Sequence, residues 1–202
     1  MTYYMSTPMS DFEYLKLILN RKYLCVGDNA LIMEENQGTE HKPHEVRINI
    51  GKLISQVALY RFDEKEKGDF MPFFNSSHHE PKQSGDAPKD LRKFCDYIIL
   101  VEKNDTAYIV LIEMKRGNTG GAEQQLAAGY EFMNYVINSG VRIRQINNMP
   151  YFSKENIMFR RVFLRLPVSP KLKTRPGDIR VEDRHGIIEY TTYNNFNLNR
   201  IL

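Results

Sequence analysis

The strongest hydrophobic pattern in the chain is a pair of apolar runs, residues 94–101 and 108–115, joined by a short polar link. Both runs are rich in Tyr, Ile and Val, which favour strands, and polar turns bound them. The link over residues 102–106 is short enough for a β-hairpin, with Asn104 and Asp105 at its tip. The pattern therefore predicts two neighbouring antiparallel strands.

Weaker patterns before this hairpin predict a helix, a second hairpin and another short helix. Ser10 is suited to be the N-cap of the first helix, and Glu13 three residues later completes a capping box. Residues 30–50 indicate a loose hairpin about a polar turn. Apolar positions within residues 53–58 have helical spacing and predict the second helix. Residues 63–93 are polar and turn-rich, so we interpret them as a connector.

After the hairpin the pattern changes from strand to helix and back to strand. A helix is predicted from about residue 122 to residue 138. Its apolar stripe consists of Leu126, Tyr130, Met133 and Ile137, with Gly129 and Val136 beside it. A strand at residues 159–166, a loop rich in Pro, Lys and Arg at 167–185 and a last strand at 186–193 follow.

Length and composition are those of one globular domain. The chain has 202 residues, of which 42% are hydrophobic and 26% charged, enough to bury a sizeable core. We divide it into an N-terminal helical and hairpin part at residues 1–62, the connector at 63–93, a core at 94–166 and a basic C-terminal extension at 167–202.

The sequence shows no sign of a membrane or secretory protein. No apolar run approaches the roughly 18 residues of a transmembrane helix, and the first residues lack the pattern of a signal peptide. Cys25 and Cys95 are too few and too isolated for a disulfide framework or a zinc site. We therefore expect a cytoplasmic location and no membrane partner.

The charge of the chain is unevenly distributed. The net charge is +3, but residues 139–202 hold 12 Lys or Arg against 5 Asp or Glu, whereas residues 1–138 hold 16 against 20. A basic C-terminal third suits a polyanionic partner such as nucleic acid, although a solvated basic surface without a ligand has the same composition. The residues expected to contact nucleic acid are Arg160, Arg161, Arg165, Lys171, Lys173 and Arg175.

Three charged residues end or interrupt the two apolar runs. If the hairpin loop holds two or four residues, Asp96 lies directly across from Glu113, and two facing carboxylates repel unless a cation lies between them. Glu113 and Lys115 share one face of their strand because side chains alternate. Such a Glu-Lys pair is also common on solvated strands, but unpaired charge in strands this apolar is costly. Carboxylate oxygens are the ligands of divalent metals, and water on such a metal becomes a nucleophile.

Asp96 on one strand and Glu113-Met114-Lys115 at the end of the next resemble the active site of the PD-(D/E)XK nuclease superfamily. The resemblance covers about residues 85–166. It implies an α/β fold with a restriction-endonuclease-like mixed β-sheet flanked by helices, here with N- and C-terminal additions. It also implies metal-dependent hydrolysis of phosphodiester bonds, with DNA preferred over RNA. Asp96 and Glu113 would hold Mg²⁺ (or Mn²⁺) with the carbonyl of Met114, and Lys115 would position the attacking water.

The resemblance extends with less force into the following helix. Some superfamily members carry a Gln four residues before a Tyr there, whereas here Tyr130 follows Gln125 by five positions. We include Gln125 as a wall of the catalytic site, with ordinary helix-surface polarity as the alternative. The glycines of residues 117–121 do not have phosphate-loop spacing and indicate a turn, although the free amides of the helix start could contact a phosphate.

Several features are left open by the sequence. Superfamily members often take a further acidic residue from an N-terminal helix, for which Glu13, Glu34 and Glu45 are candidates. The same fold could instead serve as a non-catalytic module that binds nucleic acid or protein, or as a nucleotide-responsive effector. A chain without a separate recognition domain is expected to act as a homo-oligomer or within a larger system. Bacterial or phage defence fits by analogy alone.

Overall fold

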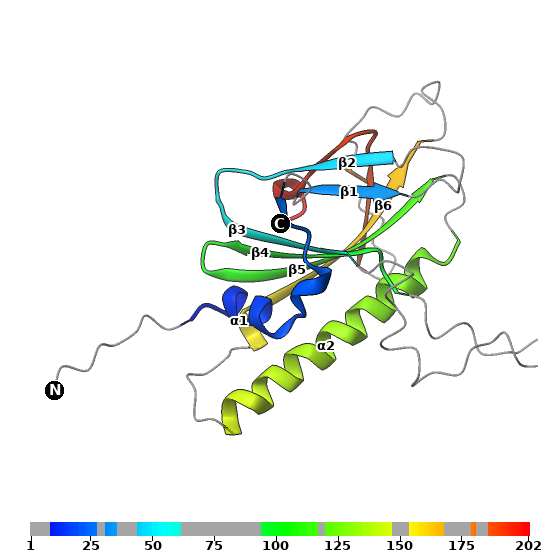
Figure 1. Ribbon diagram of the computed structural model, residues 1–202. Coiled ribbons are helices and arrows are strands. Elements are labelled where there is room, and N and C mark those ends of the chain that lie inside the picture. The colour runs from blue at the N-terminus through cyan, green and yellow to red at the C-terminus, as the bar shows by residue number, and fades with distance from the viewer. Residues whose placement is uncertain are drawn as a thin grey trace, which may run out of the picture.

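The fold was analysed in a computed structural model of the 202-residue chain. It describes residues 9–27, 31–35, 44–61, 94–116, 120–146, 154–167, 179–180 and 186–202. This part is mixed α/β and contains two mixed sheets and two α-helices, α1 (Asp11–Ile18) and α2 (Ala122–Ile146). In Figure 1 the helices lie below the larger sheet and the smaller sheet lies above it. None of these helices is long and apolar enough to cross a membrane.

The larger sheet has six strands in the order β3-β4-β5-β6-β8-β7. Their bounds are Ile54–Arg61 (β3), Tyr97–Lys103 (β4), Thr106–Arg116 (β5), Ile157–Leu166 (β6), Ile179–Arg180 (β7) and Ile187–Thr191 (β8). β3, β4 and β5 are antiparallel, β5, β6 and β8 are parallel, and β7 is antiparallel to β8. Parallel neighbours need a long crossover, and α2 makes it between β5 and β6.

The smaller sheet joins the two ends of the described chain. It has the order β1-β2-β9, with β1 at Ile32–Glu35, β2 at His44–Asn49 and β9 at Asn195–Asn197. β1 and β2 are antiparallel, as the loose hairpin predicted, and β9 is parallel to β2. Among the described residues, short 3₁₀ helices at Arg21–Tyr23, Lys154–Asn156 and Leu198–Arg200 complete these elements. The predicted N- and C-terminal additions thus build one shared layer, and β3 and β8 extend the main sheet.

Both faces of the large sheet are covered, so its central strands are apolar without alternation. The face toward the helices contains Ile98, Leu100, Ile109 and Leu111, packed with Leu126, Met133 and Ile137 of the predicted helix stripe. The opposite face contains Ile99, Val110 and Ile112, packed with Val46, Ile48 and Phe196 of the smaller sheet. Each strand side chain in this list has no exposed surface, apart from the 2% of Ile48.

The central hairpin has the predicted two-residue loop. Asn104 and Asp105 both have positive φ, 49° and 60°, as the tight turns that match strand twist require. Tyr97 is the partner of Ile112 in the β4–β5 register. Asp96, the residue before β4, therefore lies opposite Glu113.

Helix α1 begins as predicted. Ser10 Oγ accepts a hydrogen bond from the Glu13 amide at 3.3 Å. The second half of the capping box is replaced by an ion pair, because the Glu13 carboxylate lies 3.5 Å from Lys16 Nζ.

Helix α2 is longer than predicted and ends at Ile146 rather than near residue 138. Contacts with α1 stabilise its last turns. Tyr14 donates a hydrogen bond from its hydroxyl to the carbonyl of Gly140 at 3.0 Å. The Arg144 guanidinium lies 3.7 Å from the centre of the Tyr14 ring and is almost fully buried.

The prediction of a short helix at residues 53–58 is wrong, because this segment opens strand β3. Ala58 and Tyr60 belong to the core on the helix side, whereas Ile54 and Leu59 belong to the core on the other side. A strand buried on both faces loses its alternation and cannot be distinguished from a helix by spacing alone. Pairing with β4, a tertiary contact, decides the outcome.

Candidate functional site

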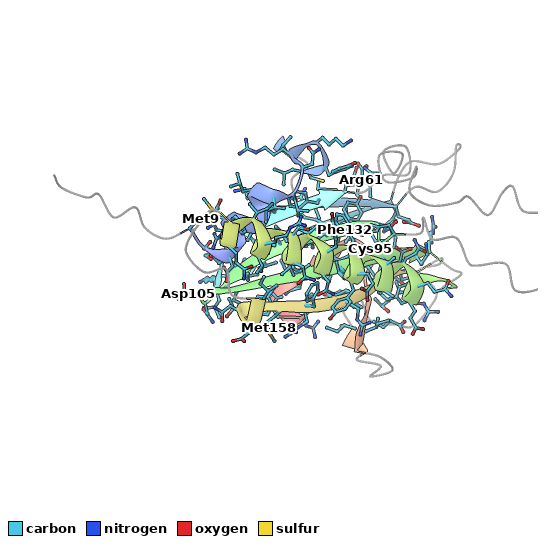
Figure 2. All side chains as sticks on the ribbon, turned by 90° about the horizontal axis from the view of Figure 1, so that it is seen from below. Met9, Arg61, Cys95, Asp105, Phe132 and Met158 are labelled. Atoms are coloured by element: carbon cyan, nitrogen blue, oxygen red, sulfur yellow. The ribbon has the colours of Figure 1, made fainter. Side chains whose placement is uncertain are left out.

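The predicted acidic residues and lysine lie at one end of the large sheet. β1, β5 and β6 end on this side of the molecule, and α2 begins there (Figure 1). Figure 2 shows Cys95, the residue before Asp96, beside α2, while Asp105 of the hairpin tip lies at the opposite end of the sheet. Gly129 allows the close approach of α2, since a Cβ at this position would lie 2.6 Å from Cys95 Sγ.

Glu113 shares a strand face with Ile109 and Leu111, which pack toward the helices, and Asp96 directly precedes the neighbouring strand β4. Asp96 is half-buried, and its Oδ2 accepts a hydrogen bond from the Met114 amide at 2.9 Å. Glu113 has no exposed surface. Met114 lies between Glu113 and Lys115, and its own side chain is buried on the opposite face, as alternation predicted.

Glu113 is buried with only part of its charge compensated. Its Oε1 lies 2.5 Å from Lys115 Nζ. Within the described part of the chain, no donor makes a hydrogen bond to its Oε2. Burial, and then the nearby charge of Asp96, raise the pKa of Glu113 to about 8, although Lys115 lowers it. A buried acceptor of this kind is costly unless something outside the chain satisfies it.

Lys115 is the cation that the facing carboxylates require. Its side chain is 25% exposed. Burial by itself lowers the pKa of Lys115, but attraction to Glu113, Asp96 and Glu35 outweighs it, and the pKa is raised. Lys115 therefore carries its positive charge at neutral pH, and it can orient a water or neutralise a phosphate rather than remove a proton.

A third carboxylate, which the sequence analysis missed, belongs to Glu35 at the end of β1. Burial, and then the charge of Asp96, raise the pKa of Glu35 to about 7, opposed by Lys115. The Tyr97 hydroxyl holds this strand end, because it accepts from the Glu34 amide at 2.7 Å and donates to the Glu34 carbonyl at 3.1 Å. Arg61 adds an ion pair to the Glu34 carboxylate at 2.7 Å.

The three acids suggested by the sequence are engaged elsewhere or exposed. Glu13 pairs with Lys16, Glu34 pairs with Arg61, and Glu45 lies on the outer face of β2. The signal for Glu35 was its spacing of two from Met33. Met33 is fully buried, so strand alternation also directs Glu35 toward the large sheet.

Gln125 lies at the start of α2 and contacts the segment that leads to Asp96. Its Nε2 donates a hydrogen bond to the Phe94 carbonyl at 3.1 Å. This contact joins the crossover helix to the residue two positions before Asp96. The role of Gln125 in a catalytic site stays a prediction.

The predicted arginines of β6 do not all lie on the same face of the strand. Arg165 is the register partner of Lys115 on the next strand, and its Nη1 lies 3.1 Å from Glu189 Oε1. Arg161 is on the same face, nearer the middle of the strand, with its guanidinium 5.8 Å from the centre of the Tyr130 ring. The structure does not bring Arg160 to this face.

Arg160 instead contacts the C-terminal segment. Its Nε donates to the Ile201 carbonyl at 3.0 Å, and its guanidinium lies 5.6 Å from the centre of the Tyr108 ring. The other three predicted nucleic-acid contacts, Lys171, Lys173 and Arg175, lie outside the described residues.

The site fits a divalent cation in its chemistry, although its metal ligands are not preassembled. In the described ranges, no group of three or more His, Cys, Asp or Glu side chains is arranged to hold a metal. Asp96 and Glu113 nevertheless supply oxygen ligands of the type that Mg²⁺ and Mn²⁺ prefer. The unsatisfied Glu113 Oε2 is the atom that such a cation would compensate.

No protein-family model, curated protein or solved structure matches this chain.

Proposed function

We propose that this chain is a metal-dependent nuclease of the PD-(D/E)XK type that hydrolyses phosphodiester bonds of nucleic acid, preferably DNA. One observation carries the proposal. Glu113 is buried opposite Asp96, is ion-paired to Lys115 and has an unsatisfied oxygen in a strand that is otherwise apolar. Perturbed acidic residues grouped around a lysine are typical of catalytic sites.

The order of elements supports a restriction-endonuclease-like core. The β4–β5 hairpin carries the acids, α2 crosses over and β6 returns parallel to β5. This is the hairpin, helix and strand order that the resemblance implies. β3 and the smaller sheet then form the N- and C-terminal additions around that core.

Each described residue of the site has its own role in the proposed reaction. Asp96, Glu113 and the Met114 carbonyl would hold Mg²⁺ or Mn²⁺, which supplies Lewis-acid stabilisation of the phosphate and a water of lowered pKa. Lys115 holds its charge beside Glu113 and can orient the attacking water. The charges of Asp96 and Lys115 act on Glu35, which we propose as a further proton acceptor at this edge of the sheet.

Arg165 is the residue best placed to hold the substrate phosphate. It lies beside Lys115, and its side chain is 48% exposed. Glu189 engages only Nη1, whereas a guanidinium has five N–H donors in a planar fork that matches phosphate. A phosphate bound there would contact the strand next to Lys115.

The test is plasmid nicking with and without Mg²⁺ or Mn²⁺, using parent, Glu113→Gln and Lys115→Ala. We expect metal-dependent nicking by the parent and its loss in both variants. Arg142→Ala is the matched control, because Arg142 is an exposed residue of α2 outside the site. Nicking at the parental rate by folded Glu113→Gln would rule the proposal out.

A non-catalytic module that binds nucleic acid or protein is the second candidate. It is favoured by the hydrogen bond from Met114 to Asp96 and by the ion pair within the site, which leave the carboxylates partly satisfied without metal. Metal titration separates the two candidates. A parent protein that binds DNA but neither binds Mn²⁺ nor nicks DNA would be such a module.

A further inference from the structure

Two adjoining hollows lie along β2 and β9 on the smaller sheet. The first has a volume of about 590 Å³ and is lined by Ile32, His44, Glu45, Arg47, Asn194 and Asn195. The second has a volume of about 430 Å³ and shares Asn194 and Asn195 with the first. The two hollows adjoin at these two residues, and we refer to them together as the groove.

The strand register makes the lining of this groove polar. In the parallel β2–β9 pair, Arg47 is the partner of Asn195, and Asn49 is the partner of Asn197. Partners on neighbouring strands project to the same side. The intervening residues, including Phe196, are buried against the large sheet. One guanidinium and three amides therefore stand side by side on the outer face.

Arg47 presents its guanidinium to the first hollow. Its side chain is exposed and, in the ranges that the structure describes, forms no hydrogen bond or ion pair. Its backbone is fixed, since its amide donates to the Asn194 carbonyl at 2.8 Å. The charged residues that line the two hollows include one acid, Glu45, and two bases, Arg47 and Arg200.

One end of the groove reaches the proposed catalytic edge. His44 is the register partner of Glu35, the third carboxylate of the candidate site. The His44 ring also bonds to the Tyr193 carbonyl, which ties the start of β2 to the segment before β9. In Figure 1 the start of β2 lies on the same side of the molecule as the ends of β5 and β6.

We infer that this groove binds an unpaired segment of the nucleic-acid substrate next to the catalytic edge. Arg47 contacts a phosphate, and the asparagine amides contact base edges, which present both donors and acceptors. The class of ligand rests on the proposed function, but the residues are separate from the proposed catalytic group.

The test is binding of a short labelled single strand in EDTA, which prevents cleavage, followed by fluorescence anisotropy at several salt concentrations. We expect Arg47→Ala to bind roughly five- to tenfold more weakly, as for loss of one charged hydrogen bond. Its log-log salt slope should fall by about 0.7, the value for one phosphate contact on a single strand. Asn195→Ala should bind more weakly with an unchanged slope, because no charge is removed.

Two further variants act as controls. Arg142→Ala removes an exposed arginine from α2, in the layer on the other side of the large sheet, and should bind as the parent does. Arg47→Lys should restore the salt slope but not the whole affinity, because lysine keeps the charge and loses the planar fork.

Parental affinity in both Arg47→Ala and Asn195→Ala would overturn the inference. Normal affinity in Asn195→Ala, together with equal competition by polyphosphate, would show an anion surface that does not contact bases, and would overturn it as well. If the parent nicks plasmid while both variants bind single strands normally, the groove does not bind nucleic acid, and the proposed nuclease function still stands. If the variants bind weakly but the parent never nicks, the groove stands and the nuclease proposal fails.

Discussion

Two ion pairs of similar chemistry lie side by side at the ends of β5 and β6, and they differ in burial. In the first, Lys115 Nζ lies 2.5 Å from a Glu113 carboxylate that has no exposed surface. In the second, Arg165 lies 3.1 Å from Glu189, and the two side chains are 48% and 17% exposed. Lys115 and Arg165 are register partners, so neighbouring positions experience very different surroundings.

The difference in burial is the reason why we propose the chemical role for the Glu113–Lys115 pair. Removing water from Glu113 destabilises its charged form and raises its pKa to about 8. A buried pair with an unsatisfied oxygen adds little to stability and is weak evidence for a structural role. The exposed pair keeps its hydration and contributes about 0–1 kcal/mol. Arg165 can therefore exchange its carboxylate for a phosphate at little cost.

The largest expected difference between the pairs is in cleavage. Under the proposed function Lys115→Ala removes the charge that would face the reacting phosphate, and we expect a loss of about 10³-fold in kcat, as for removal of one preorganised electrostatic group. Arg165→Ala removes a substrate contact, so about a tenfold rise in KM with little change in kcat is expected. Steady-state nicking kinetics in Mg²⁺ measure both. Equal kcat losses in the two variants would contradict the division of roles.

The next effect is on stability in the presence of metal. At a hundredfold excess over Kd, Mn²⁺ bound only by the native state adds about 2.7 kcal/mol to the free energy of unfolding. We expect the melting temperature of the parent to rise with Mn²⁺, the rise to shrink in Asp96→Asn, and Glu189→Gln to respond as the parent does. A melting temperature indifferent to millimolar metal would count against ligands at Asp96 and Glu113.

A third effect is the pH dependence of stability in EDTA. The pKa of Glu113 rises on folding from its ordinary 4.5 to about 8, so the folded state binds the proton more tightly. The stabilisation is therefore complete below about pH 4.5 and is lost as pH rises toward 8. Each pKa unit is about 1.4 kcal/mol, and we expect a loss on the order of 3 to 4 kcal/mol between pH 5 and 8.

Chemical denaturation of the parent and Glu113→Gln across this pH range measures the contribution. The glutamine variant should lose less stability than the parent as pH rises, while Arg165→Ala should follow the parent. Identical pH profiles for the parent and Glu113→Gln would show that the Glu113 pKa is not raised by folding.

The smallest effect concerns the exposed pair. A double-mutant cycle with Arg165→Ala and Glu189→Gln should give a coupling free energy below about 1 kcal/mol, further reduced by salt. Urea unfolding at low and high salt measures it. A coupling free energy above 2 kcal/mol would show that the exposed pair is as strong as a buried one, and the proposed difference between the two pairs would be wrong.

Local patterns correctly predicted the elements whose signals are short-range. The Asn104-Asp105 turn set the loop length, and the loop length set the register of Asp96 against Glu113. The Ser10 cap and the apolar stripe of α2 were also correct. The end of α2 was not, because Tyr14 and Arg144, far apart in sequence, stabilise its last turns.

The candidate site was predicted in part for the same reason. Asp96, Glu113 and Lys115 lie on one hairpin, so alternation and turn geometry bring them together. Glu35 comes from a separate strand, held by the Tyr97 hydroxyl on the Glu34 backbone. No sequence spacing predicts that Glu35 and Asp96 come close together. Their proximity depends on the packing of the small sheet against the large one.

The sequence by itself therefore determined the hairpin, its register and the shared face of Glu113 and Lys115, because strand periodicity and a two-residue turn are local physics. Tertiary structure decided that residues 54–61 form a strand, that Glu35 comes near enough to Asp96 for its charge to act there, and that β2 and β9 pair. These features depend on contacts between distant segments, whose burial and charge are set only when the layers pack.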